Sequence, residues 1–204
     1  MIDSRFIFLA VAFSLFGAWS YIRDTLRGET SPNRVTWSLW GLEGILAFAV
    51  EVQQHVGLAS LMTLILGLVP CAVVAVSFRN PHRAWRIDAF DAFCGALSLL
   101  GVVFWAFVHE PTVALVSFVA ADQLAALPTV RKSWRAPSTE TARAFAMGTL
   151  NTAITLMTLR ELTTAGALFP GAIMVTDLVI AVLVSFKMGP RWRKELPVRV
   201  VEVM

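Results

Sequence analysis

The sequence predicts an all-α membrane protein with seven transmembrane helices. Of its 204 residues, 57% are hydrophobic and only 15% are charged, and the mean hydropathy is +0.69. A soluble domain is usually about half apolar and about a quarter charged. The apolar residues form long continuous runs, and basic residues gather in alternate connections between these runs. Seven helices of roughly 20 residues each would use most of this length, so we expect no separate soluble domain.

Seven apolar runs, bounded by charged residues, glycine and proline, define the expected spans. Because each run is continuous and not alternating, it predicts a helix and not a strand of a membrane barrel. The first run lacks the small-x-small site of a cleaved signal peptide, so we expect it to be a retained helix. The expected spans cover residues 6–22, 34–52, 57–78, 88–108, 112–130, 141–160 and 167–187.

The basic residues predict the orientation of these spans. Alternate connections and the tail, which lie on one side of the membrane, contain 15 of the 17 basic residues. Only Arg5 and Arg160 fall on the other side. Basic residues are retained in the cytoplasm, so we expect the N-terminus outside and the C-terminus inside. The positive charge is then explained by topology and by the anionic inner leaflet, and it predicts no nucleic-acid partner.

A weak internal repeat recurs at an offset of 108 residues. Val76-Ser77-Phe78-Arg79 returns as Val184-Ser185-Phe186-Lys187, and the same offset pairs Arg23 with Arg131. Two three-helix repeats share one orientation only if a single helix links them. We therefore expect repeats at 1–87 and 112–187, a linker helix within 88–111 and a basic cytoplasmic tail at 188–204. Parallel repeats of this kind are a transporter architecture, with the substrate site between them.

Two segments carry a resemblance to a known family. Leu127-Pro128-Thr129-Val130-Arg131-Lys132-Ser133-Trp134, followed by Pro137-Ser138-Thr139-Glu140, has a late helical proline, a basic turn and then Ser/Thr entering the next helix. The stretch from Tyr21 to Trp37 has a similar layout, with Ser20 where the proline should be. This layout resembles the SWEET, SemiSWEET and PQ-loop transporter superfamily, with Thr129 in place of Gln. The resemblance implies 3+1+3 helices and alternating access. Vitamin-precursor carriers of the PnuC type share a related plan.

Three carboxylic residues lie deep in the expected spans, where ionisable groups normally face the bundle interior. Glu43 is central in the second span, Asp122 in the fifth, with Gln123 beside it, and Asp177 in the seventh. No lysine or arginine lies at matching depth. Each carboxyl could carry a proton, pair with a cationic substrate or only hydrogen-bond a neighbouring helix.

Helical spacing adds neutral polar and aromatic candidates to this site. Trp40 shares a face with Glu43, and Asn151 and Thr155 share a face on the sixth span. Because Glu43 and Asn151 are repeat-equivalent, we expect them to meet across the pseudo-symmetry axis. Sugar carriers of the superfamily are associated with a tryptophan pair and an asparagine pair, and Trp37 or Trp40 could supply an aromatic wall here. The expected substrate-binding residues are Trp37, Trp40, Glu43, Asp122, Gln123, Asn151, Thr155 and Asp177.

Pro32 and Pro128 are expected to bend or cap helices, either as hinges of an alternating-access carrier or as static kinks. The histidines His55, His82 and His109 fall in loops, so we expect no intramembrane hydrolase, metal site or cofactor. These observations predict a carrier of a small polar solute in a bacterial-type inner membrane, either a facilitator or proton-coupled. The alternative is a seven-helix receptor or regulatory scaffold that binds a ligand without transporting it.

Overall fold

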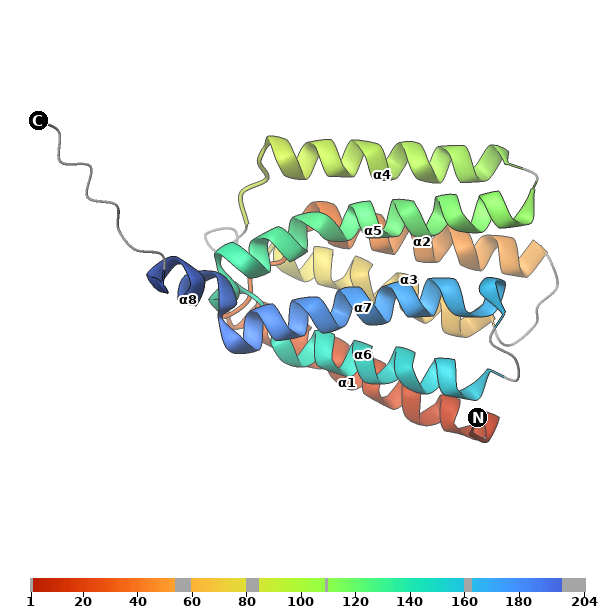
Figure 1. Cartoon of the computed structure of the whole chain (residues 1–204), viewed down its shortest axis with the longest axis horizontal. Helices are drawn as coiled ribbons and strands as arrows, with labels where there is room; N and C mark the ends of the chain where they lie inside the picture. Colours follow the sequence, from red (N-terminus) through yellow and green to blue (C-terminus); the bar gives the residue numbers. More distant parts are fainter. Residues whose placement is uncertain (1, 54–59, 80–84, 109, 160–162, 196–204) are drawn as a thin grey trace, which may run out of the picture.

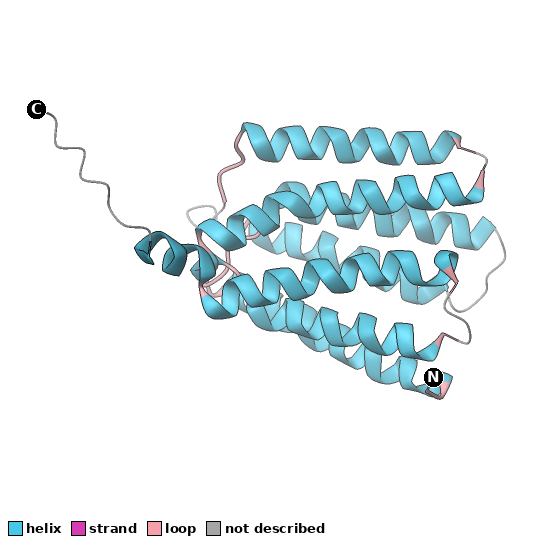
Figure 2. Cartoon of the chain, in the orientation of Figure 1, coloured by secondary structure: helices cyan, strands magenta, loops and turns pink. Residues whose placement is uncertain are grey.

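A computed structural model describes residues 2–53, 60–79, 85–108, 110–159 and 163–195. Every regular element in these ranges is helical (Figure 2). Two short 3₁₀ turns, η1 (Ser4–Phe6) and η4 (Pro137–Thr139), accompany the α-helices. The α-helices are α1 (Ile7–Leu26), α2 (Arg34–Gln53), α3 (Ser60–Ser77), α4 (Ala89–Phe107), α5 (Pro111–Arg135), α6 (Ala142–Thr158), α7 (Thr164–Phe186) and α8 (Met188–Glu195).

The all-helical architecture agrees with the prediction, and each expected span coincides with one of the helices α1 to α7. Four stretches in the described residues are long and apolar enough to cross a membrane: Ile7–Leu26, Ala89–Phe107, Thr112–Arg135 and Gly166–Phe186. The apolar part of α3 is shorter, Leu64–Ser77, and the described parts of α2 and α6 are not among the four. Seven crossings therefore stay a prediction. The predicted histidine positions His55, His82 and His109 lie outside the described residues.

Local sequence signals explain several helix boundaries. Asp88 forms a capping box with Asp91 at the start of α4, which satisfies amide groups that the first turn leaves unpaired. Glu110 caps α5 just before Pro111, and proline is favoured at the first helical position because it has no N–H to satisfy. Lys187 adopts a left-handed conformation with a φ of 50° and ends α7. The expected basic tail therefore begins as the short helix α8.

The long helices form one bundle in which each half of the chain has the same packing order. Helix α3 packs against both α1 and α2, and α7 packs against both α5 and α6. The halves meet where α1 packs on α6 and where α2 packs on α5, while α4 lies against α5 and α2. The start of α1 lies at one end of the bundle, and α8 lies at the other (Figure 1). We call the latter the α8 end.

The distribution of side chains indicates that lipid surrounds the bundle. Phe8 and Phe107 are 73% and 75% exposed, while Glu43 is 2% exposed and Lys132 is fully buried. Water would disfavour this arrangement, because soluble proteins rarely expose large contiguous apolar surfaces. In hydrocarbon, polar side chains must face the bundle interior. The fold is therefore that of an integral membrane protein.

Glycines allow the closest helix contact in the first half. A Cβ built on Gly44 in α2 would lie 2.5 Å from the Cα of Gly67 in α3, far inside contact distance. Small residues let membrane helices approach backbone to backbone, and this close packing substitutes for the hydrophobic driving force that lipid removes. The α2–α3 contact thus fixes the position of α2, the helix that carries Glu43.

Candidate functional site

A chain of polar side chains crosses the middle of the bundle. Ser98 of α4 donates a hydrogen bond to Oε1 of Glu43 at 3.3 Å. The carboxyl group of Glu43 neighbours that of Asp122 on α5, and Nε2 of Gln123 donates to Oδ2 of Asp122 at 2.9 Å. The hydroxyl of Thr176 on α7 donates to Oε1 of Gln123. Four helices therefore contribute to one polar chain, and two carboxyl groups are at its centre.

Asp177, also on α7, lies near this chain. Its half-buried carboxyl is close enough to Asp122 for the two to interact electrostatically. A Cβ built on Gly148 of α6 would lie 2.0 Å from Oδ2 of Asp177, so any larger residue at this position would force the carboxyl to move. The structure thus brings the three predicted carboxylic residues into one region, with Asp122 as the common neighbour of the other two.

Buried polar atoms without a hydrogen-bond partner gather on two elements. Among the described residues, these atoms are Asn33 Nδ2, Thr36 Oγ1, Glu43 Oε2, Thr129 Oγ1 and Ser133 Oγ. Asn33 immediately precedes α2, Thr36 and Glu43 are on α2, and the other two are on α5, which packs against α2. An unpaired buried polar group costs about 1–3 kcal/mol, so such a concentration needs an explanation. We call Asn33, Thr36, Glu43, Asp122, Thr129 and Ser133 the α2–α5 polar seam.

At the α8 end, the seam is closed by a buried ion pair. Nζ of Lys132, on α5, lies 2.5 Å from Oε1 of Glu140, and neither side chain is exposed. Lys132 also donates to the carbonyl oxygen of Ser31, in the connection between α1 and α2. The hydroxyl of Tyr21 on α1 donates to Oε2 of Glu140 at 2.8 Å. These contacts tie the connection of the first half to the connection of the second.

A second set of hydrogen bonds joins the same two connections. The Thr30 and Thr141 hydroxyl oxygens are 2.5 Å apart, and Thr141 donates to Oδ2 of Asp24 at 3.1 Å. The backbone N–H of Ser31 donates to the carbonyl of Thr139 at 3.0 Å. Backbone and side chains together therefore hold the two halves in contact at the α8 end.

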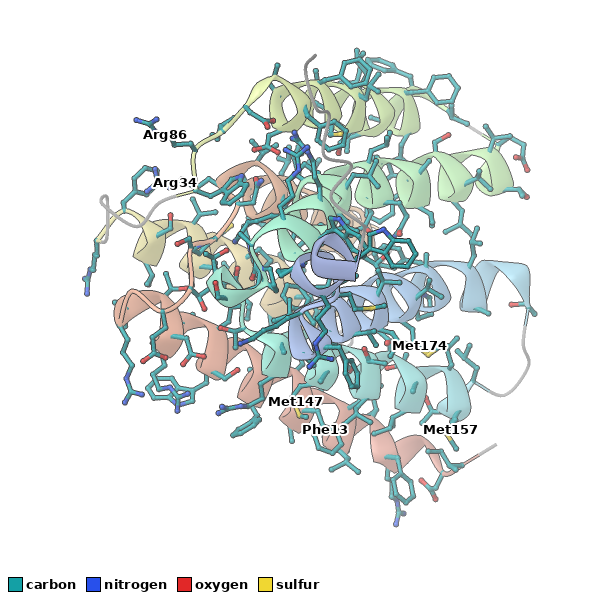
Figure 3. The ribbon with its side chains drawn as sticks, turned by 60° about the vertical axis from the view of Figure 1, so that its left-hand side comes forward. Phe13, Arg34, Arg86, Met147, Met157 and Met174 are labelled. Atoms are coloured by element: carbon teal, nitrogen blue, oxygen red, sulfur yellow. The ribbon has the colours of Figure 1, made fainter. Side chains whose placement is uncertain are left out.

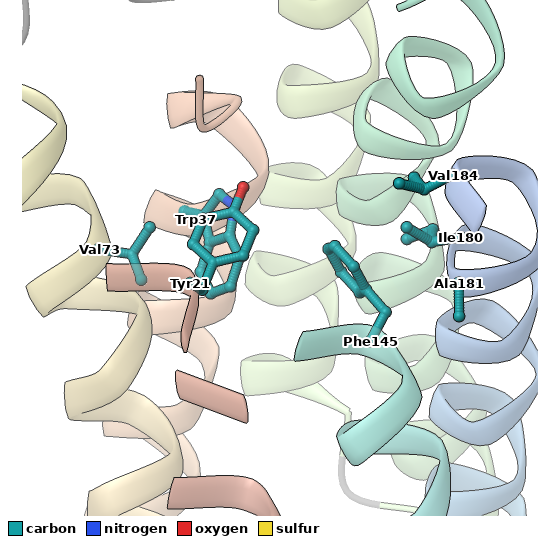
Figure 4. Close-up of a cluster of buried hydrophobic side chains, with 7 residues drawn as sticks. All are labelled: Tyr21, Trp37, Val73, Phe145, Ile180, Ala181 and Val184. Carbon is teal, nitrogen blue, oxygen red and sulfur yellow. The ribbon is translucent and has the colours of Figure 1, made fainter. Parts of the chain in front are cut away.

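An aromatic cluster lies next to this closure (Figure 4). The ring of Tyr21 lies 4.5 Å from that of Trp37 and 6.0 Å from that of Phe145, centroid to centroid. Nε1 of Trp37 donates to the Tyr21 hydroxyl at 3.1 Å. Trp40 packs edge-on against Trp37, with ring centroids 5.3 Å apart. The aromatic side chains therefore connect the closure with the helix face that carries Glu43.

Basic side chains also surround the α8 end, where Arg34 and Arg86 are seen in Figure 3. Arg131 donates to Oδ2 of Asp88 at 2.6 Å and links α5 to the start of α4. The backbone N–H of Asp91 donates to Asp88 and, together with Arg131, holds the pKa of the Asp88 carboxyl below its usual value. Arg34 donates to the hydroxyl and carbonyl oxygens of Ser77, each at 2.9 Å, and links α2 to α3.

The structure separates the other predicted site residues. Asn151 forms no described contact with Glu43, which instead meets Ser98 and Asp122. The Thr155 hydroxyl donates to the carbonyl of Asn151 on its own helix, at 2.9 Å. The two expected hinge residues are both buried. Pro128 is inside α5, and Pro32 precedes α2. The expected meeting of Glu43 and Asn151 is therefore replaced by a Glu43–Asp122 pair.

The sequence did not single out the closure residues Tyr21, Lys132 and Glu140. Lys132 belongs to the motif and to the basic residues that predict the topology, but it was not among the expected site residues, although it is completely buried. The available signal was its place in a proline-containing basic turn eight residues before Glu140. Ser98 was missed because a lone serine in an apolar run usually bonds only its own helix.

An open cavity of about 490 Å³ lies between α5 and α7. Its lining is apolar except for Gln123, the residue that joins Asp122 to Thr176. The other lining residues belong to the first half of α7, which begins at the end of the bundle opposite α8. The lining consists of Gln123, Ala167, Leu168, Gly171, Ala172 and Val175.

Comparisons with protein-family models, curated proteins and solved structures gave no match. The features that indicate a function are therefore the polar seam, the closure at the α8 end and the packing of the two halves.

Proposed function

We propose that this protein is a membrane carrier of a small polar solute that works by alternating access between two three-helix repeats. The observation that carries the proposal is the α2–α5 polar seam. Its unpaired polar atoms belong to α2, to the residue before α2 and to α5, which come from different halves of the chain and pack against each other. Polar groups inside a membrane bundle are expensive and mark solute or ion pathways.

The packing of the two halves supports the repeats of this proposal. The 108-residue offset pairs α1 with α5, α2 with α6 and α3 with α7. The α1–α6 contact therefore corresponds to the α5–α2 contact, and the α2–α3 contact corresponds to the α6–α7 contact. Trp37 and Phe145 are repeat-equivalent, and their rings lie 6.5 Å apart. This is the pattern expected for two parallel repeats around an axis along the membrane normal, with α4 as the linker.

The proposal includes seven crossings, with the N-terminus outside and the α8 end in the cytoplasm of a bacterial-type cell. The described basic residues support this orientation, because nearly all of them lie in connections or helix turns at the α8 end. In the proposed cycle, the contacts of Lys132, Glu140, Tyr21 and Ser31 close the cytoplasmic side. Opening that side requires these contacts to separate as the repeats rock apart.

A reversible covalent lock tests this cycle. The hydroxyl oxygens of Thr30 and Thr141 are 2.5 Å apart, so Thr30→Cys and Thr141→Cys bring two sulfur atoms within reach of a disulfide. The natural cysteines Cys71 and Cys94 are first replaced by alanine. Transport is measured in proteoliposomes as solute-induced current and as counterflow, with a panel of sugars, nucleosides, amines and amino acids.

A carrier should lose at least about tenfold in transport rate when oxidised and recover when reduced, because the lock holds the cytoplasmic side closed. The single variant Thr30→Cys controls for oxidation damage and should keep its rate. Transport that persists in the oxidised double variant would contradict alternating access at this closure. Ligand binding without transport in any state would instead identify a receptor or scaffold.

A further inference from the structure

We infer that the solute bound at the Glu43–Asp122 pair is a small organic cation with one positive charge and an apolar body. This inference rests on the proposed function, because it names the class of solute that the same site would carry. The sequence alone left the class of solute open. The inference follows from three features of the site: its charge, its unpaired acceptor and its apolar surroundings.

Three carboxyl groups gather at the site, and no basic side chain in the described part of the chain forms an ion pair with them. They come from three helices, and Glu43 and Asp177 each interact electrostatically with Asp122. The nearest basic residues along α5 are Arg131, which pairs with Asp88, and Lys132, nine and ten residues or roughly 14 and 15 Å further along the helix. Lys132 is already paired with Glu140. An anionic solute would be repelled here, and with a neutral solute one of the adjacent carboxyl groups would have to take up a proton.

The unpaired acceptor is Oε2 of Glu43. Glu43 is 2% exposed, and this oxygen has no hydrogen-bond partner among the described residues. Its other oxygen accepts from Ser98, and the neighbouring group is another carboxyl. A carboxylate oxygen accepts hydrogen bonds and attracts cations. An ammonium group placed between Glu43 and Asp122 would therefore satisfy the orphaned oxygen and relieve the repulsion together.

The surroundings favour an organic cation over a bare ion. The cavity of about 490 Å³ adjoins Gln123, which donates to Asp122, and its other lining residues are apolar. Trp40 is one helical turn before Glu43 and half-buried, where an aromatic face can attract a cation. Methyl or methylene groups would contact these walls while the charged nitrogen meets the carboxyl groups.

The test uses probe pairs that match in shape and differ in charge. Choline is compared with its neutral isostere 3,3-dimethylbutan-1-ol, and primary and tertiary alkylamines are compared with alcohols of equal carbon skeleton. Thermal unfolding of the full-length protein in detergent is measured with each probe. A cation at a hundredfold excess over its Kd should raise the Tm by about 5 °C or more. Its neutral partner should raise the Tm far less.

The charge-neutralising variants Glu43→Gln and Asp122→Asn should abolish the shift, while Glu29→Gln, at an exposed carboxyl of the α8 end, should retain it. Equal or larger shifts from the neutral probes, or no shift from any cation, would overturn the inference. Uptake of a neutral probe by proteoliposomes would overturn it while leaving the carrier function in place. A cation that stabilises the protein without being taken up would support the site and contradict transport.

Discussion

Lys132 and Glu140 form an ion pair of 2.5 Å in which neither side chain is exposed. Removing one partner of a buried pair leaves an uncompensated charge and costs about 3–5 kcal/mol. We therefore expect Lys132→Met to lower the Tm by roughly 6 °C or more. The double variant Lys132→Met/Glu140→Gln should be more stable than this single variant, because it leaves no lone charge. Thermal unfolding in detergent measures both.

Arg23→Met is the control, since Arg23 pairs with Asp24 at 2.8 Å but is one-third exposed. Such pairs contribute about 1 kcal/mol or less, so the Tm should change little. A Lys132→Met variant that unfolds at the wild-type temperature would show that the pair does not hold the two connections together.

Helix positions could be predicted well from the sequence, because continuous apolar runs are a direct consequence of lipid as the solvent. Which residues meet inside the bundle could not. Two repeat-equivalent residues are expected at symmetric positions about the pseudo-symmetry axis. They are expected to touch each other only if both lie near that axis. Trp37 and Phe145 satisfy this condition, at 6.5 Å. Glu43 does not meet its equivalent Asn151, because it faces α4 and α5 instead.

The contacts that form the closure at the α8 end could not be predicted from the sequence for a different reason. Basic residues near the ends of membrane helices usually face the cytoplasm, so Lys132 was indistinguishable from its exposed neighbour Arg135. Lys132 donates to Ser31, and its partner Glu140 accepts from Tyr21, in each case across more than 100 residues of the chain. These groups meet only in the folded protein. The hydrophobic periodicity of the sequence does not predict which distant residues meet.

The close approach of α2 and α3 leads to a prediction about glycine. Gly44→Ala places a methyl group 2.5 Å from the Cα of Gly67, so the helices must separate, at about 1–3 kcal/mol. Gly171→Ala on α7 meets nothing within 4 Å and should be neutral or stabilising by up to about 1 kcal/mol. Unfolding temperatures of the two variants make the comparison. Equal effects would mean that helix propensity and not packing decides the outcome at Gly44.

Asp88 predicts an acid-sensitive contribution to stability. The backbone N–H of Asp91 and the guanidinium of Arg131 hold the pKa of Asp88 below its ordinary value. A carboxyl with a lowered folded-state pKa stabilises the fold fully above its unfolded pKa, about 3.9, and loses this contribution as pH falls through the folded pKa. We expect the Tm of the wild type to fall between pH 5 and pH 2.5 more steeply than that of Asp88→Asn. Asparagine can still cap α4, so parallel curves would contradict a titrating Asp88.

The segregation of charge predicts which end of the bundle each side of the membrane contacts. Exposed positions alternate along the chain between the α8 end, with Glu29 and Ser138, and the opposite end, with Thr112 and Thr163. Each is changed to cysteine in a chain in which Cys71 and Cys94 are alanine. Because basic residues stay inside, a membrane-impermeant maleimide added to intact cells should label Thr112→Cys and Thr163→Cys. The variants Glu29→Cys and Ser138→Cys should react only after permeabilisation. The reverse labelling pattern would show that the orientation is inverted. Labelling of Glu29→Cys and Thr163→Cys but not of Ser138→Cys would mean that the two halves are antiparallel, which would contradict the parallel repeats.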